Sequence, residues 1–287
     1  MENYKGRGWC AGAALVLFAA LAVGAWADEA DYVGASTCVG CHSERAEAFK
    51  STSHGKRLPL VKDVPYEKSC ETCHGPGAKH AAAGGDKNDP GFATIRKVGQ
   101  ETCLTCHKGG ETKFWGISAH AQNGLDCTKC HGVHAGKGPK NLKLSATETC
   151  LQCHQKQRMD INLPSHHPVK EGRMSCADCH NPHGGESGNI KAETLTELCF
   201  KCHADKAGPF VHEHPPVAED CSNCHVPHGS QNTKLLKRKE PFLCQQCHVQ
   251  PHWDDAATVN VQRTYYFCTK CHNEIHGSDR KARFLPR

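Results

Sequence analysis

Long hydrophobic runs are scarce in this 287-residue chain, as are the residues that build large apolar cores. Only 38% of the residues are hydrophobic and 6% are aromatic. Beyond the first 27 residues, no segment approaches the ~18 apolar residues that a membrane helix requires. We therefore expect that the mature chain does not cross a bilayer by itself, and that apolar side chains alone cannot fill its interior.

The single long apolar stretch lies near the N-terminus. Two basic residues precede a run from Ala11 to Val23 that is too short for a membrane span, and a small-x-small cleavage site ends at Ala27. We expect residues 1–27 to be a secretory signal peptide and the mature chain to begin near Asp28. Cys10 precedes the apolar run, whereas a lipoprotein cysteine follows it, so Cys10 is expected to leave with the signal. These features predict export to the periplasm.

Cysteine, by contrast, is abundant. The chain has 21 cysteines, far more than cytosolic globular proteins carry. The twenty after Cys10 form ten Cys-x-x-Cys-His motifs. The motifs are Cys38-Cys41-His42, Cys70-Cys73-His74, Cys103-Cys106-His107, Cys127-Cys130-His131, Cys150-Cys153-His154, Cys176-Cys179-His180, Cys199-Cys202-His203, Cys221-Cys224-His225, Cys244-Cys247-His248 and Cys268-Cys271-His272.

This motif is the attachment signature of c-type haem. Two cysteines three residues apart lie on one side of a helical turn and can form thioethers to the two haem vinyl groups, while the adjacent histidine binds the iron. A single Cys-x-x-Cys could equally be a zinc ligand pair or a thiol redox site. Because histidine follows all ten, the sequence predicts ten covalently attached haem c groups as cofactors.

The remaining histidines can supply the second axial ligands. Of 22 histidines, twelve lie outside the attachment motifs, and methionine is too rare to be the general ligand. The predicted distal ligands are His54, His80, His120, His134, His167, His183, His214, His228, His252 and His276. Five of these follow an attachment histidine by three or four residues, too close to reach the opposite face of the same porphyrin. We expect them to bind neighbouring haems.

Two histidines are surplus, and both alternatives lie in doublets. His166 and His167 are adjacent, and His212 and His214 are separated by one residue. The similarity of the two His-Pro segments favours His167 and His214 as the ligands. Bis-histidine ligation throughout would give low reduction potentials and leave no iron position open to a substrate, so we do not expect an enzyme or any catalytic residue.

The motifs fall into five pairs, which predicts a tandem array. The expected fold is a mostly irregular multihaem cytochrome c with short α-helices, an elongated linear array of five di-haem units in which the haems form the core. Capping boxes predict helix starts at Ser145 and Thr194, a further helix is expected over 43–53, and no convincing strand is visible. The predicted units are 28–102, 103–145, 146–193, 194–239 and 240–287, the last with a basic tail.

Charge also excludes one class of partner. The formal net charge is +5, but two propionates on each of ten haems would bring the mature holoprotein to roughly −6. We therefore expect no nucleic-acid partner.

The chain resembles the periplasmic decahaem cytochromes of outer-membrane porin–cytochrome conduits, the MtrA/DmsE family. The resemblance covers essentially the whole mature chain. It rests on the ten motifs, on Cys-His-Gly-Pro-Gly at 73–77, Ser-His-His-Pro-Val at 165–169, Cys-His-Asn-Pro-His-Gly at 179–184, and the ending at 271–278. It implies a nearly linear haem chain inserted into an outer-membrane β-barrel. The implied partners are that barrel, an extracellular multihaem cytochrome or reductase, and a periplasmic or inner-membrane electron donor.

Three alternatives remain beside this conduit. A soluble periplasmic shuttle or electron-storage cytochrome would carry the same haem equipment. A multihaem oxidoreductase would need an open or unusual haem site, which ten complete motifs disfavour. A polymerising extracellular cytochrome would bind a haem of the next subunit through a terminal histidine, and a full internal supply of ligands makes this unnecessary.

Overall fold

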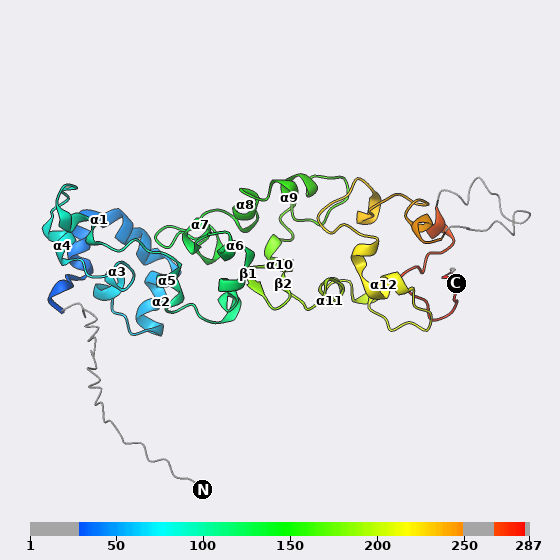
Figure 1. The fold of residues 1–287 in the computed structure, drawn as a ribbon, viewed down its shortest axis with the longest axis horizontal. Coiled ribbons are helices and arrows are strands. Elements are labelled where there is room, and N and C mark those ends of the chain that lie inside the picture. The colour runs from blue at the N-terminus through cyan, green and yellow to red at the C-terminus, as the bar shows by residue number, and fades with distance from the viewer. Residues whose placement is uncertain (1–28, 249–266, 285–287) are drawn as a thin grey trace, which may run out of the picture.

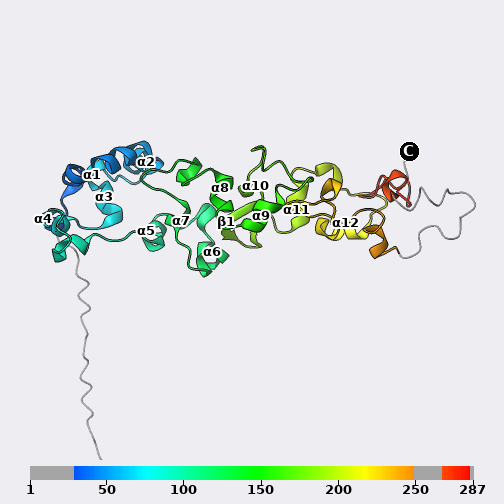
Figure 2. The same ribbon diagram turned by 90° about the horizontal axis from the view of Figure 1, so that it is seen from above.

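The described part of the molecule is narrow and elongated. The computed structural model describes residues 29–248 and 267–284, so the predicted signal peptide and His252 lie outside the described residues. In both views the chain order follows the long axis, with the first helices at one end and the C-terminal residues at the other (Figure 1, Figure 2).

The helices are short, as predicted, and most of the chain between them is irregular. The α-helices are α1 (Gly34–Ser51), α2 (Ser53–Val61), α3 (Tyr66–His74), α4 (Ala78–Ala82), α5 (Gln100–Leu104), α6 (Ala119–Gln122), α7 (Cys127–Cys130), α8 (Ala146–Leu151), α9 (Gln155–Asp160), α10 (Cys176–Cys179), α11 (Leu195–Phe200) and α12 (Pro215–Glu219). The 3₁₀ turns are η1 (Glu29–Asp31), η2 (Pro90–Thr94), η3 (Gly110–Thr112), η4 (Trp115–Ile117), η5 (Pro139–Asn141), η6 (Ala204–Lys206), η7 (Cys221–Asn223), η8 (Thr233–Leu235), η9 (Cys244–Gln246) and η11 (Cys268–Lys270).

The longest helices lie at the N-terminal end, where the buried carboxylate of Glu71 in α3 contacts the start of α1. Glu71, within the second motif, accepts hydrogen bonds from the backbone N–H groups of Val33 (3.1 Å), Gly34 (3.0 Å) and Gly77 (2.8 Å). Two of these donors lie at the start of α1, where helices leave N–H groups unpaired and favour negative charge. The helix expected over 43–53 therefore begins earlier, at Gly34, and ends at Ser51.

Side-chain caps begin the helices that carry later motifs. Thr194 and Glu197 form the predicted capping box at the start of α11. At α8, Ser145 accepts the predicted hydrogen bond from Glu148 N at 3.2 Å. A further capping box, Ser175 with Asp178, starts α10. These caps hold the first cysteine of each motif on a single helical turn.

The structure also contains strands, which the sequence analysis did not anticipate. β1 (His180–Gly185) and β2 (Gly188–Ile190) form an antiparallel hairpin. Isolated antiparallel bridges, His131 with Leu142 and His225 with Leu236, occur at the equivalent places after two other motifs. The hairpin sequence lacks an apolar–polar alternation, so the strand periodicity could not reveal it.

The apolar core is very small. The buried apolar side chains among the described residues are Ala35, Trp115, Leu151 and Ile161. No helix in the described ranges has the length and hydropathy needed to span a membrane. Protein side chains alone therefore provide little of the interior that would hold so long a chain together.

Candidate haem-binding centres

Each attachment motif folds as one tight turn. In seven motifs the backbone N–H of the histidine donates to the carbonyl of the first cysteine at 2.9–3.1 Å, and in an eighth the N–H of His180 donates to the carbonyl of Cys176. Both cysteines are thus on the same turn as the histidine, as thioether attachment requires. The twenty cysteines of the described residues are all free thiols, so none is used in a disulfide.

Nine attachment histidines each face one histidine from elsewhere in the chain. Their ring centroids are 5.8–6.4 Å apart. The pairs, attachment histidine first, are His42–His80, His74–His134, His107–His54, His131–His183, His154–His120, His180–His228, His203–His167, His225–His276 and His248–His214.

This spacing fits one metal ion between each pair. A metal–imidazole nitrogen bond of about 2 Å on either side places the ring centroids about 6 Å apart. Among the described residues there is no group of three or more His, Cys, Asp or Glu side chains that could hold a metal ion. The pairs therefore lack the further protein ligands of a zinc site, whereas a porphyrin supplies its own equatorial nitrogens.

The tenth attachment histidine, His272, is described, but its predicted counterpart His252 is not. Nδ1 of His272 lies 2.6 Å from the carbonyl oxygen of Arg283. Each of the nine other predicted distal histidines is already opposite another motif. His252 therefore remains the proposed ligand for the tenth site.

The structure separates the members of the two doublets. His167 faces His203 and His214 faces His248. His166 instead contacts Glu171, with 3.0 Å between Nε2 and Oε1, and this carboxylate raises the pKa of the half-buried imidazole. His212 forms a backbone bridge with Ser278. The geometry brings together the histidines that the sequence comparison favoured.

Burial keeps several distal histidines in the form that binds metal. The pKa values of His54, His134, His183, His214, His228 and His276 are all lowered, primarily by burial. In most of them the facing histidine lowers the pKa further, because two positive charges at this distance repel each other. A neutral imidazole with a free ring nitrogen is the ligand form.

Backbone carbonyls orient many of the rings. Nδ1 lies 2.8 Å from Phe92 O for His80, 2.9 Å from Pro182 O for His120, and 2.7 Å from Pro227 O for His167. Since a carbonyl oxygen only accepts hydrogen bonds, Nδ1 must be the donor, which leaves Nε2 free to bind a metal. No sequence signal marks these carbonyls, because they belong to residues of ordinary type far along the chain.

The thiols form a ladder that follows the order of the motifs. Within each predicted unit the first cysteines of the two motifs are close enough for one thiol to shift the pKa of the other. These pairs are Cys38–Cys70, Cys103–Cys127, Cys150–Cys176, Cys199–Cys221 and Cys244–Cys268. Between units, the second cysteines interact electrostatically, in the pairs Cys73–Cys106, Cys130–Cys153, Cys179–Cys202 and Cys224–Cys247.

The pKa shifts of these thiols report how close they are. Burial, and then the neighbouring thiol, raises the pKa of Cys38 and of Cys127 to about 11. The pKa of Cys150 is raised mainly by its hydrogen bond with Cys176. Thioether formation would abolish these titrations and leave the proximity. Consecutive attachment sites are therefore neighbours from the first motif to the tenth.

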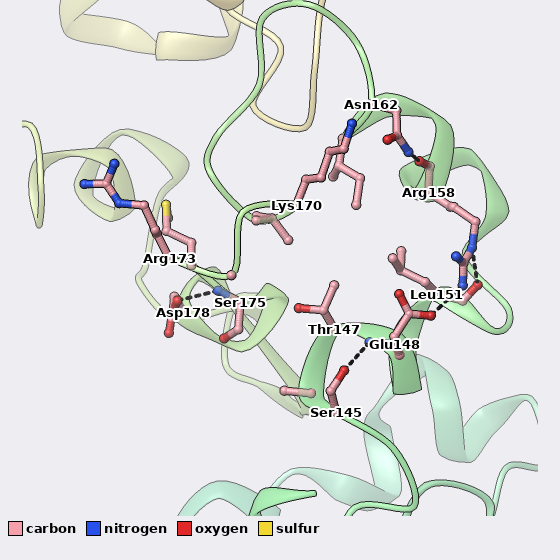
Figure 3. A pocket seen from close by; sticks show the side chains of 15 residues that line it. Ser145, Thr147, Glu148, Leu151, Arg158, Asn162, Lys170, Arg173, Ser175 and Asp178 are labelled. Atoms are coloured by element: carbon pink, nitrogen blue, oxygen red, sulfur yellow. Dashed lines mark hydrogen bonds and ion pairs between the residues drawn. The ribbon is translucent and has the colours of Figure 1, made fainter.

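One cleft of about 630 Å³ lies apart from these centres. Its lining comes from α8, α9 and the segment that leads into α10, and it includes no cysteine or histidine. Figure 3 shows the Glu148–Arg158 ion pair (2.9 Å) on one side and the Ser175–Asp178 contact on the other. With no candidate ligand in its wall, this cleft is not one of the haem centres.

Comparisons with known proteins identify related chains. The family described as the doubled CXXCH motif matches residues 119–159, 166–208 and 214–252. Each matched segment joins the second motif of one predicted unit to the first motif of the next. Each also contains both histidines of one facing pair: His120–His154, His167–His203 or His214–His248.

Three relatives illustrate the similarity. The chain is 36% identical over 196 residues to the multiheme cytochrome MtrA of Shewanella baltica, covering 65% of this chain and 58% of that protein. It is 26% identical over 133 residues to the high-molecular-weight cytochrome c of Nitratidesulfovibrio vulgaris (42% and 22%). It is 30% identical over 123 residues to the C-type polyheme cytochrome OmcB of Geobacter sulfurreducens (38% and 15%). The match thus spans less than two thirds of each relative.

Proposed function

Because this chain is a multihaem c-type cytochrome related to MtrA, with paired Cys-x-x-Cys-His motifs, we propose that it carries electrons along ten haems between the periplasm and the cell exterior. The observation that carries this proposal is the set of nine facing histidine pairs, each spaced for one iron. The thiol ladder supports it, because it makes every attachment site the neighbour of the next.

The role of the chain in electron transfer is to hold the haems, orient their ligands and enclose them. Haem supplies reversible one-electron chemistry at its iron. The cysteines would hold each haem covalently, and the paired histidines would bind its iron. Carbonyls such as Pro182 O and Pro227 O keep the ligand rings in one tautomer. With a histidine on each side of the iron there is no site for substrate, so the proposed activity is electron transfer and not catalysis.

The periplasm and an outer-membrane β-barrel are the proposed location and partner. The signal-like residues 1–27 support export, and the relation to MtrA supports the conduit. An irregular backbone exposed to lipid is not tolerated in a bilayer, so a chain of this kind would need a protein sheath to pass electrons across one. An extracellular multihaem cytochrome or reductase would then receive or donate the electrons outside, and a periplasmic or inner-membrane donor would serve the inner end.

A periplasmic shuttle is the second candidate, because a shuttle would need the same histidine pairs. The two functions differ in the partner that the protein retains. We propose tagging the chain at its C-terminus, extracting outer membranes in mild detergent and identifying the proteins that co-purify with it. A tagged periplasmic c-type cytochrome of unrelated sequence, extracted in the same way, is the control.

A stoichiometric β-barrel protein with this chain, absent from the control, is the expected result. Recovery of the chain only as a free periplasmic monomer would overturn the conduit and leave the shuttle. Recovery as a self-associated filament would favour the polymerising cytochrome instead.

A further inference from the structure

The second attachment histidine of each predicted unit has a distinctive environment. These five histidines are partly buried, and in four of them Nδ1 faces a backbone carbonyl farther along the chain. The distances are 3.3 Å for His74 to Arg96 O, 3.0 Å for His131 to Lys140 O, 2.8 Å for His225 to Lys234 O, and 2.6 Å for His272 to Arg283 O.

The remaining histidine of this set, His180 in the third unit, is the exception. Its Nδ1 is buried and has no hydrogen-bond partner among the described residues. Its ring nevertheless faces His228 at 6.0 Å between centroids, as in the other pairs. The His180–His228 site therefore has two facing histidines, as its counterparts do, but Nδ1 of its attachment histidine lacks the hydrogen bond to a backbone carbonyl.

A shorter loop explains the missing acceptor. In the second unit, Lys140 and the next residue both have positive φ (53° and 58°), and in the fourth unit Lys234 and the next residue do likewise (57° and 56°). This left-handed pair curls the chain so that the lysine carbonyl points at the histidine ring. In the third unit the chain instead forms the hairpin β1–β2.

The loop of the third unit is one residue shorter. Lys143 N, Lys191 N and Lys237 N each donate to the carbonyl of the second cysteine in their unit, at 2.9, 3.0 and 2.8 Å. These equivalent lysines lie thirteen, twelve and thirteen residues after that cysteine. One of the two left-handed residues has no counterpart in the hairpin, and the carbonyl acceptor is lost with it.

We propose that the shortened hairpin tunes the His180–His228 haem, so that it is reduced more easily than it would be with the carbonyl acceptor of its counterparts. A hydrogen bond from Nδ1–H to a carbonyl makes imidazole a stronger donor to iron and favours the ferric state. Without that bond, the ferrous state is relatively favoured. This proposal rests on the proposed ten-haem assignment and is independent of any barrel partner.

Charge near the same site acts in the opposite direction and must be held constant in the test. Asp178 lies within this attachment motif, where the second and fourth units have Lys129 and Asn223. A carboxylate near the iron favours the ferric state, so absolute potentials of different sites would mix the two effects. The two loops also differ in charge, because Gly136–Leu142 contains Lys137 and Lys140 whereas Gly185–Ile190 contains Glu186. Exchanging only the loop isolates the hydrogen bond when Asp178 is retained and each inserted loop carries the charge of the loop that it replaces.

The test is a reciprocal loop exchange, followed by potentiometric titration of the purified holoprotein. One variant receives Gly136–Leu142, with Lys137→Glu and Lys140→Gln, in place of Gly185–Ile190, which restores the longer loop, keeps Gly184 and preserves the loop charge. That glycine stays because its φ is +91° and a Cβ there would lie 3.0 Å from Phe114 O. The reverse variant carries Gly185–Ile190, with Glu186→Lys and Ser187→Lys to keep the charge of the replaced loop, in place of Gly136–Leu142. Haem content per chain is measured for both.

About one tenth of the titration, the share of one haem among ten, should move to lower potential in the first variant and to higher potential in the reverse variant. A matched control places Gly136–Leu142, with Lys137→Gln so that the loop charge is unchanged, in positions 230–236. Its titration should not change, because His225 already has its carbonyl partner and the longer loop supplies another.

If either exchange binds ten haems and leaves the titration unchanged, or shifts it in the opposite direction, the proposal is wrong. Should one variant fail to bind ten haems, the other decides alone. Neither result depends on whether a β-barrel co-purifies, so failure of this inference is distinct from failure of the proposed conduit.

Discussion

At the scale of single residues, the histidines differ in the partners of their two ring nitrogens. A ligand histidine needs a free ring nitrogen aimed at its partner, and burial or a carbonyl on the other nitrogen enforces this. His183 meets the requirement through burial, which lowers its pKa, and it faces His131 at 6.1 Å between centroids. His166 faces a carboxylate instead.

We predict that His183→Ala leaves the haem of His131 without its distal ligand. About one tenth of the ferric haem should change from low-spin to high-spin, because one of ten sites becomes five-coordinate. Optical and electron paramagnetic resonance spectra of the oxidised protein measure this change. His166→Ala is the matched control and should leave every haem low-spin. A fully low-spin His183→Ala protein would show that the ligand assignment is wrong.

Ring orientation divides the facing pairs into two groups. Six pairs have interplanar angles of 13–27°. The pairs His54–His107, His120–His154 and His167–His203 are crossed at 80°, 63° and 51°. Crossed ligand planes change the orbital splitting of low-spin ferric iron, so we predict a separate large-g resonance from these three sites. His54→Ala should reduce that resonance, whereas His183→Ala should leave it intact; equal loss in both variants would contradict the grouping.

Glu71 is a further residue whose role can be tested. It is 6% exposed and accepts three backbone hydrogen bonds, so Glu71→Gln places an amide against N–H donors. Leaving a buried donor unpaired costs about 1–3 kcal/mol, which corresponds to amide exchange faster by about 5- to 150-fold. Hydrogen-exchange mass spectrometry of residues 33–77 measures this rate of amide exchange.

Glu47→Gln is the matched control for that experiment. Glu47 pairs with Lys50 at 3.1 Å, but both side chains are exposed, and such pairs contribute little to stability. Exchange at residues 33–77 should therefore be unchanged. Equal effects of the two substitutions would show that Glu71 does not hold the start of α1 in place.

At the scale of elements, facing histidines tie each predicted unit to its neighbours. The second unit receives His54 and gives His134 across one boundary. It receives His183 and gives His120 across the next. The same exchange continues to the fifth unit through His276 and His214. A predicted unit is therefore a repeat of sequence that does not contain a complete set of its own ligands.

This exchange predicts the result of truncation. A chain ending at residue 193 keeps six motifs but loses His228, the counterpart of His180. The chain should also carry His167→Ala, because His167 loses its own counterpart His203 and could otherwise substitute. One of the six haems should then be high-spin, as measured by optical spectra at known haem content. Six low-spin haems would show that each unit supplies its own ligands.

Short elements were predictable where the signal is local. The capping residues of α8 and α11 lie three positions apart, and the predicted helix starts at Ser145 and Thr194 are observed. The capping box at Ser175 has Asp178 where the usual capping box has glutamate or glutamine. The earlier start of α1 depends on Glu71, 37 residues from Gly34, and no local pattern contains that information.

At the scale of the whole molecule, the motifs foretold an irregular chain with short helices, but the pairing of ligands could not be derived from them. His54 and His107 are 53 residues apart, and the residues around either histidine do not predict that the two face each other. The same applies to the carbonyl partners of the rings, because any residue type provides a carbonyl. Only the folded backbone determines which carbonyl reaches which histidine.

The small apolar core makes a final prediction about the haem-free chain. Among the described residues, four apolar side chains are buried. Burying a side chain of the size of leucine or isoleucine contributes about 1.5–3 kcal/mol, whereas ordering the backbone costs about 1–2 kcal/mol per residue. The interior that balances this cost must come from the haems, so the chain made without haem attachment should be largely unfolded. Circular dichroism and hydrogen exchange, compared with holoprotein from the same host, measure this. Protected amides in α3 and α8 of the haem-free chain would show that the protein folds before the haems are attached.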